Sequence, residues 1–553
     1  MIQNKLKIGI LLDSYVIPAW AFLALERIVN LDCVDISVII LNNNKDAPEY
    51  KPDLYNSNNH NITYRLLNKI DNAIFRRGPD AFAAKDAQKF FSDVPVIMVK
   101  PISQGEPGCF GPSEIKEILS YQLDILIRMG FESLTGEILN AAKFGVWSYY
   151  HGDHQAIRSN LPGFWEVANY ETETGSILYI LKNNSTFGPV LYKSWIQTYP
   201  LSPARNRNRC FWVSSSFLPR QIELLYRLGE TGFFTEIEKY NPTPVHKDIK
   251  QYSSPSNIQV LRTYLSLFIR NIREIFLRSF FLDQWYLLFE INSHSTWSFS
   301  DFKEIIPPKD RFWADPHIIQ SNGIYYIFVE ELINQNRKAH LSVIEMDSNG
   351  NCKEPVQVLS KKYHLSYPFV FKWNDTYYMI PETSENRTIE LYECITFPYE
   401  WKFRMNLMEN ILAVDTTLLY YQEKWWLFTG ITENEGTYPL VELFLFSSAE
   451  LLSKNWTPHP LNPIISDVKK ARPAGKIFIK DGKIYRPSQD YSNLYRWGFG
   501  INEIIHLSET GYLEKEVAKI NPDWNKNIEF IHTFAQAGSL TMIDACQKKW
   551  KGF

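Results

Sequence analysis

Two stretches of the sequence carry residue types that could do chemistry, and the first runs from Trp147 to His154. It places His151, Asp153 and His154 within four positions, close to Tyr149. Imidazoles and carboxylates crowded beside glycine and aromatic residues are typical of a pocket lining rather than of a core strand. We expect any chemistry of the first half of the chain to take place here.

The second stretch is a series of similar segments that recur about every 50 residues from Trp313 onward. Each segment begins with a polar or charged residue beside a small residue or proline. An apolar strand, a tight turn and an aromatic strand follow. The residues that lead the five segments are Asp315, Tyr367, Asp415, Arg472 and His532, and further acids within them are Glu331, Glu382 and Asp490.

Repeats of this length, each with several short strands, indicate the blades of a β-propeller, so five copies predict a five-bladed propeller. Strands near residues 285–289 are expected to close the ring with the last blade. The lead residues would start the innermost strands and meet at one end of the central channel.

A ring of this kind suits sugar chemistry. Glycosidic cleavage needs two carboxyl groups about 5–10 Å apart, and Asp315 with Glu382 or Asp415 could provide them. Tyr367, Arg472 and His532 would then bind the substrate, with no metal indicated. Alternatively, the inward polar residues only cap the blades with hydrogen bonds.

The first half predicts an α/β fold with a doubly wound parallel sheet, because apolar strands alternate with helices. Ligands of such sheets bind beyond the carboxyl ends of the strands, where Asp13, Arg128 and His151 are expected. Asp13 could equally cap a helix, and Arg128 could form a structural ion pair. The expected strands are 7–13, 35–41, 95–99, 123–128 and 144–148, and the expected helices are 18–28, 113–119 and 136–143.

Ordered motifs in the first half resemble the formyltransferase superfamily over about residues 5–200. They are Asp124 to Phe131, Gly136 to Leu139, Gly145 to His151, Gly163 to Glu166, Thr174-Gly175 and Gly188 to Leu191. The resemblance implies 10-formyltetrahydrofolate as cofactor and an amine acceptor, such as an amino sugar on a nucleotide.

In this resemblance His151 takes the position of the catalytic histidine of the family. Tyr149 stands where the family has asparagine, and Thr186 stands where it has aspartate. A phenol can donate a hydrogen bond to an oxyanion, but threonine cannot act as a carboxylate base. Asp153 or His154 could take the role of the missing aspartate. Alternatively, the domain has kept the fold of the family and lost its reaction.

The second half resembles, over about residues 283–545, the N-terminal domain of plant glucosamine inositolphosphorylceramide transferases and the five-bladed furanosidase-type glycoside hydrolases. The segments Trp313 to Pro316, Tyr367 to Phe369, Pro381 to Thr383 and Val414 to Thr417 carry this resemblance. It implies a sugar ligand. Tyr367 departs from the hydrolase pattern, which has an aspartate there.

Between the halves, residues 257–281 predict an amphipathic helix that carries Arg262, Arg270, Arg273 and Arg278. Such a helix either lies on an anionic membrane surface or is wedged between two domains. The expected domains are therefore residues 1–245 and 283–553, joined by a linker at 246–282.

Composition limits the class of protein. The 553 residues carry a net charge of −3, which gives no general attraction to nucleic acid, and six scattered cysteines, which indicate neither a disulfide framework nor a zinc site. With neither a signal peptide nor a spanning apolar run evident, we expect a cytoplasmic protein, either free or peripheral to the inner face of the membrane.

The leading functional hypothesis is a formyltransferase-like transferase that acts on a sugar nucleotide or a glycan or glycolipid acceptor in surface-polysaccharide biosynthesis, with the propeller binding the sugar. One alternative is a propeller-based glycoside hydrolase or glycosyltransferase with a degenerate first domain. Another is a glycan-binding scaffold without catalysis.

Overall fold

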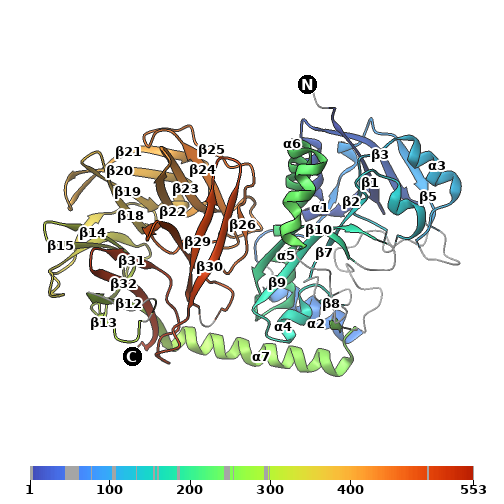
Figure 1. The fold of residues 1–553 in the computed structure, drawn as a ribbon. Coiled ribbons are helices and arrows are strands. Elements are labelled where there is room, and N and C mark those ends of the chain that lie inside the picture. Colours follow the sequence, from blue (N-terminus) through green and yellow to red (C-terminus); the bar gives the residue numbers. More distant parts are fainter. Residues whose placement is uncertain are drawn as a thin grey trace. The chain divides into compact units, whose positions relative to one another are not determined.

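The computed structural model describes residues 4–43, 62–75, 77–101, 108–131, 134–152, 156–158, 161–182, 187–241, 250–252, 254–291, 297, 299–494 and 497–551. Asp153, His154 and Thr186 lie outside these ranges. The chain divides into two compact units, residues 1–270 with 434–437, and residues 271–433 with 438–553 (Figure 1).

The first unit is built on a seven-stranded sheet with the order β10-β9-β7-β6-β1-β3-β5. The five predicted strands are present and pair in parallel, and their apolar side chains are largely buried. The strand bounds are β1 Leu6–Leu12, β3 Val34–Asn42, β5 Val96–Val99, β6 Ile125–Arg128, β7 Val146–Tyr150, β9 Glu173–Leu181 and β10 Phe187–Gln197.

A parallel sheet was predicted, but the observed sheet is mixed. Strand β9 runs antiparallel to β7, and β10 runs antiparallel to β9. The short connection between β9 and β10 explains the direction of β10 relative to β9, because a parallel crossover needs about a dozen residues or more. The helix expected at 136–143 is instead a short 3₁₀ turn, Gly136–Asn140.

The other predicted helices of this unit are present. They are α1 (Ala19–Val29), α3 (Pro112–Ser120) and α7 (Asn257–Phe280), the last of which carries the chain into the second unit. Within the described residues, no helix is both long and apolar enough to cross a bilayer. The remaining elements are β2 Val16–Pro18, α2 Ile62–Phe75, β4 Ala84–Asp86, β8 Ala156–Arg158, α4 Phe164–Ala168, α5 Pro203–Ser214, α6 Phe217–Ile237 and β11 Lys250–Tyr252.

The second unit is a five-bladed propeller, as the repeat predicted (Figure 1). Blades I, II and IV are β14–β17, β18–β21 and β27–β30, and blade III is β22–β26. Blade V joins β12 and β13 to β31 and β32, so strands from both ends of the unit close the ring. The bounds are β12 Phe281–Ile291, β13 Lys303–Ile305, β14 Arg311–Ser321, β15 Ile324–Ile333, β16 His340–Met346, β17 Val356–Leu359, β18 Ser366–Trp373, β19 Thr376–Glu382, β20 Thr388–Thr396, β21 Glu400–Glu409, β22 Ala413–Tyr421, β23 Lys424–Ile431, β24 Glu442–Ser448, β25 Thr457–Pro458, β26 Ile465–Ser466, β27 Phe478–Lys480, β28 Lys483–Gln489, β29 Phe499–Leu507, β30 Tyr512–Ile520, β31 Phe534–Ala537 and β32 Leu540–Trp550.

Buried apolar clusters join each blade to the next. Since the fifth cluster returns from blade V to blade I, the apolar core runs around a closed ring, and sheet edges are protected as in other propellers. Pairs of members that join successive blades are Phe328 with Val370, Phe369 with Leu427, Phe428 with Ile484, Phe499 with Phe534, and Leu287 with Ile327.

The lead residues of the first three blades sit in β-bulges at the start of the innermost strands. Asp315, Tyr367 and Asp415 have φ of 51°, 44° and 51°, a region that non-glycine residues seldom adopt. A bulge re-aims its side chain away from the regular ladder. In blade IV the residue with positive φ near the start of the inner strand is Gly475, with φ of 128°, and Arg472 lies three positions before it.

We predict that Tyr367→Phe destabilises the propeller. The buried Tyr367 hydroxyl lies 2.8 Å from Thr417 Oγ1 and accepts a hydrogen bond of 2.9 Å from the Gly475 N–H, which links three blades. Phenylalanine would leave a buried N–H unpaired, at a cost of about 1–3 kcal/mol. Urea titration measures this loss. The exposed Tyr420→Phe serves as control, and an equal effect of the two substitutions would contradict the prediction.

Candidate functional site

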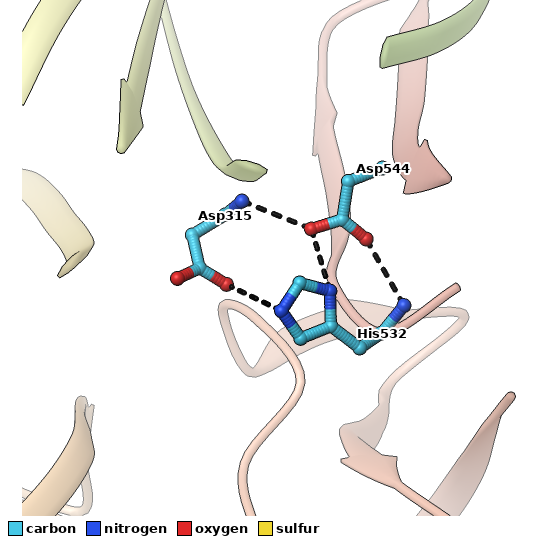
Figure 2. Close-up of side chains that lie close together, drawn as sticks. All are labelled: Asp315, His532 and Asp544. Atoms are coloured by element: carbon cyan, nitrogen blue, oxygen red, sulfur yellow. Dashed lines mark hydrogen bonds and ion pairs between the residues drawn. The ribbon is translucent and has the colours of Figure 1, made fainter. Parts of the chain in front are cut away.

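His532 lies between two buried carboxylates where the propeller ring closes (Figure 2). Its Nδ1 is 2.7 Å from Asp544 Oδ2, and its Nε2 is 3.3 Å from Asp315 Oδ1. Asp315 comes from β14 of blade I, whereas Asp544 comes from β32 of blade V. The three side chains therefore tie the first and last blades together.

Backbone donors hold Asp544 in place. Its Oδ1 accepts from the N–H groups of His532 at 3.0 Å and Thr533 at 2.9 Å, and its Oδ2 accepts from the N–H of Asp315 at 2.9 Å. Asp315 is equally occupied, since its Oδ1 accepts from Thr533 Oγ1 at 2.8 Å and its Oδ2 from the N–H of Tyr367 at 3.2 Å. This network orients the lead residues of blades I and II.

The two carboxylates determine the charge of His532. Burial alone would lower its pKa, but Asp544 and Asp315 raise the pKa of His532 to about 9. Burial also works against ionised Asp544, yet charged His532 and the hydrogen bonds hold its pKa below the usual value. At neutral pH, His532 is therefore a buried cation between two carboxylates.

The same three residues offer ligand atoms that all lie within 4.8 Å of one another, which is close enough to hold a metal ion. A metal would have to replace the proton on His532 and compete with the backbone donors of Asp544. The donor set is thus already satisfied by an ion pair, and this geometry favours a proton over a metal.

A second group on the ring consists of Asp415, Arg472 and Glu382. The Arg472 guanidinium contacts both Asp415 oxygens, through a short Nε–Oδ2 contact and through Nη2 to Oδ1 at 3.3 Å. Gln489 Nε2 also donates to Asp415 Oδ2 at 2.9 Å. Arg472 Nη2 is 3.7 Å from Glu382 Oε2, so one cation serves two carboxyl groups.

Glu382 is the unusual member of this group. Ser384 Oγ donates to its Oε1 at 2.8 Å, but its buried Oε2 has no hydrogen-bond partner among the described residues. Burial and the neighbouring Asp415 raise the pKa of Glu382 to about 8, although Arg472 opposes the shift. The Glu382 side chain is 11% exposed and Arg472 is 18% exposed, whereas Asp415 is 1% exposed.

The structure thus brings the predicted ring residues together: Asp315, Tyr367, Asp415, Arg472, His532 and Glu382. Glu331 instead lies within blade I, where Arg311 and His340 bind it and its pKa falls to about 2. Asp490 pairs with Lys519 at 2.8 Å. The sequence analysis did not assign a role to Asp544, although a single acid in the apolar segment Leu540 to Ala545 was a usable signal.

In the first unit, His151 and Tyr149 are packed within an aromatic cluster. The His151 ring stacks on Phe211 with centroids 3.5 Å apart, and its Nε2 is 2.9 Å from Ser214 Oγ. Burial lowers the pKa of His151 to about 3, and the Tyr149 hydroxyl accepts from the Leu218 N–H at 3.3 Å. His151 and Tyr149 are therefore packed as core residues are, whereas the sequence predicted that they line a pocket.

Asp13 and Arg128 lie at the carboxyl edge of the sheet, as expected. Asp13 Oδ1 accepts from the Phe131 N–H at 3.0 Å and from Asn42 Nδ2 at 2.8 Å. Arg128 Nε donates to Ser148 Oγ at 2.9 Å. Both side chains connect neighbouring strand ends, and Asp13 does not cap helix α1, whose N-cap is Pro18. A ligand contact of either residue stays a prediction.

Comparison with known proteins supports the propeller part of the resemblance. Residues 303–535 match the family "Glucosamine inositolphosphorylceramide transferase 1, N-terminal". The protein of that name from Oryza sativa subsp. japonica is 31% identical over 235 residues, which cover 41% of this chain and 31% of that protein. The Arabidopsis thaliana protein is 31% identical over 209 residues, covering 37% and 27%. The chain thus spans about a third of the length of these relatives.

Solved structures give a weaker likeness. The GH62 α-L-arabinofuranosidase catalytic domain of Coprinopsis cinerea is 11% identical with a TM-score of 0.33, covering 42% of this chain and 90% of that one. A thermostable family-43 glycoside hydrolase is 14% identical with a TM-score of 0.34, covering 44% and 90%. Similarity at this level adds nothing to what the five sheets themselves establish about the fold.

We predict that His532 makes stability fall with rising pH. Because its folded-state pKa of about 9 exceeds the ordinary 6.5, its contribution is complete below pH 6.5 and is lost as pH rises through 9. That gap corresponds to about 3 kcal/mol. Denaturant titrations of the wild type and His532→Gln between pH 6 and about 9.5 measure the difference.

Glu382 also destabilises the fold as it ionises, but both proteins retain it, so its effect cancels in the comparison. Parallel pH profiles for the wild type and His532→Gln would contradict the assignment of a charged His532.

Proposed function

We propose that the protein acts on a glycan or glycolipid, that the propeller binds the sugar at the ring of lead residues, and that Glu382 donates the proton when a bond at the sugar is made or broken. The observation that carries the proposal is the position of Glu382, whose buried Oε2 lies 3.7 Å from Arg472 Nη2 but has no hydrogen-bond partner among the described residues. Burial and Asp415 raise the pKa of this carboxyl group. A carboxyl group that keeps its proton near neutral pH suits general acid catalysis.

The charges around Glu382 support this role. Reaction at the anomeric carbon needs a proton for the departing oxygen and a negative charge near the developing oxocarbenium ion. Glu382 supplies the proton, and Asp415, which is in contact with Arg472, supplies the negative charge. Because both oxygens of Asp315 are occupied by internal contacts, Asp315 positions the ring in this proposal instead of attacking the substrate.

The glycolipid part of the proposal rests on the name of the relatives, glucosamine inositolphosphorylceramide transferase 1. The match lies in a region named N-terminal and covers about a third of their length. The particular donor and acceptor of those proteins therefore enter only as the first compounds to try, and a role in surface-polysaccharide biosynthesis remains part of the proposal.

Formyl transfer has less support. His151 is enclosed by aromatic rings, and Asp153 lies outside the described residues. The described side chains near His151 therefore give no fit to 10-formyltetrahydrofolate, and no step of the proposed mechanism runs through that cofactor.

We predict that Glu382→Gln abolishes turnover and preserves sugar binding. Glutamine keeps the shape of the side chain but cannot supply the proton, so the rate should fall by about 10²–10⁴-fold. Purified protein is incubated with sugar nucleotides and with vesicles that contain inositolphosphorylceramide, products are followed by mass spectrometry, and binding is followed by calorimetry. The exposed Glu400→Gln in the same blade is the matched control and should behave like the wild type.

The pH profile provides a second readout. Wild-type turnover should decline above pH 8 as Glu382 loses its proton. Sugar binding without turnover by the wild type would make the protein a glycan-binding scaffold and refute the catalytic part. Turnover that survives Glu382→Gln but disappears in Asp315→Asn would move the chemistry to Asp315. Formyl transfer that requires His151 would refute the proposal as a whole.

A further inference from the structure

We propose that helices α2 and α7 form a surface that binds peripherally to an anionic membrane. This inference stands independently of the proposed sugar chemistry. Helix α7 exposes large apolar side chains along its whole length, and Phe268 among them is 63% exposed. They are Ile258, Leu261, Leu265, Phe268, Ile269, Ile272, Ile275 and Phe276.

Helix α2 of the first unit carries a second apolar stripe. Ile62, Leu66, Ile70 and Ile74 follow one another at intervals of four residues, so they lie on one line along the helix. All four are exposed, and Ile62 reaches 82%. Such a stripe normally faces the protein core, where burying it stabilises the fold.

The inner faces of both helices rest on one buried cluster. Tyr64 and Leu67 of α2, and Val260 and Tyr264 of α7, pack around Phe164. The two helices are therefore fixed on the first unit by these side chains, and the exposed stripes consist of other residues. The exposed apolar side chains of these helices are thus not part of this buried cluster.

Charged residues are buried on the same two helices. Arg270 of α7 is buried, and its Nη1 donates to the carbonyl oxygens of Val167 at 3.0 Å and Pro200 at 2.8 Å. Asp71 of α2 is buried and accepts from the Ala204 N–H at 2.8 Å. Both helices therefore bury a charge and expose apolar side chains, which is the reverse of the usual arrangement for a water-facing helix.

The exposed charge on the two helices is basic. Arg65 and Lys69 are exposed on α2, and Arg262 and Arg273 are exposed on α7, where Arg278 is paired with Glu274. The acidic side chains of the two helices add no unpaired negative charge to this surface, since Asp71 is buried and Glu274 pairs with Arg278 at 2.7 Å. The whole chain is slightly acidic, with net charge −3, so the basic character of these helices is not that of the chain as a whole.

Large apolar side chains flanked by arginine and lysine are what an interfacial helix needs to insert its apolar face and hold anionic headgroups. At about 1.5 Å per residue, the 24 residues of α7 extend about 36 Å, which is longer than a typical helix-binding groove and suits a planar surface. The stripes of both helices are exposed, as a peripheral membrane contact requires.

The test is flotation of the full-length protein with vesicles of phosphatidylcholine, alone or mixed with phosphatidylglycerol. We expect binding to the mixed vesicles only. The double substitutions Phe268→Glu with Ile272→Glu, and Leu66→Glu with Ile70→Glu, should each weaken binding at least about tenfold, because glutamate cannot enter the apolar boundary. All four positions are exposed, so the fold should persist, and circular dichroism checks this.

The matched control is Ile395→Glu, an exposed apolar position on β20 of the propeller, which should bind like the wild type. Arg262→Gln should weaken binding about fivefold at low salt, equivalent to about 1 kcal/mol for one basic residue. Absence of flotation, equal binding to uncharged vesicles, or a dimer that the same glutamate substitutions dissociate in sedimentation would each overturn the proposal.

Discussion

The closed propeller depends on a buried cation between two buried carboxylates. His532 joins Asp315 of the first blade to Asp544 of the last, at the seam where β12 and β32 also pair. Isolated carboxylates in such a place would be costly to bury. The proton on His532 compensates for that cost, so the same charge that closes the ring also fixes Asp315 and, through it, the backbone of Tyr367.

From this seam the polar contacts continue around the ring. The Tyr367 hydroxyl reaches blades III and IV, where Arg472 holds Asp415 and lies beside Glu382. One arginine cannot fully compensate two adjacent carboxylates, and burial raises the energy of both. Glu382 therefore retains its proton because Arg472 contacts both oxygens of Asp415 and lies farther from Glu382. The raised pKa of Glu382 thus depends on its neighbours in the ring.

The sequence allowed some of this to be predicted. The repeat revealed five blades, and apolar runs revealed five parallel strands. The β9–β10 hairpin was not predicted, because an apolar run does not indicate strand direction. Asp544 was left without a role because its partners lie 12 and 229 positions away. The packing around His151 was not predicted for the same reason, since its neighbours Phe211 and Ser214 come from another part of the chain.

The two surfaces proposed here are connected by the covalent chain. Helix α7 ends at Phe280, and β12 begins at Phe281 without a linker. Phe280 stacks on Trp550 at the end of β32, the strand that carries Asp544, and Leu287 of β12 pairs directly with Asp544. A membrane contact made by the last turns of α7 would thus be transmitted through paired strands to the closing blade. Because Phe280 and Phe281 are consecutive, a contact at the end of the helix would act directly on the blade that carries Asp544.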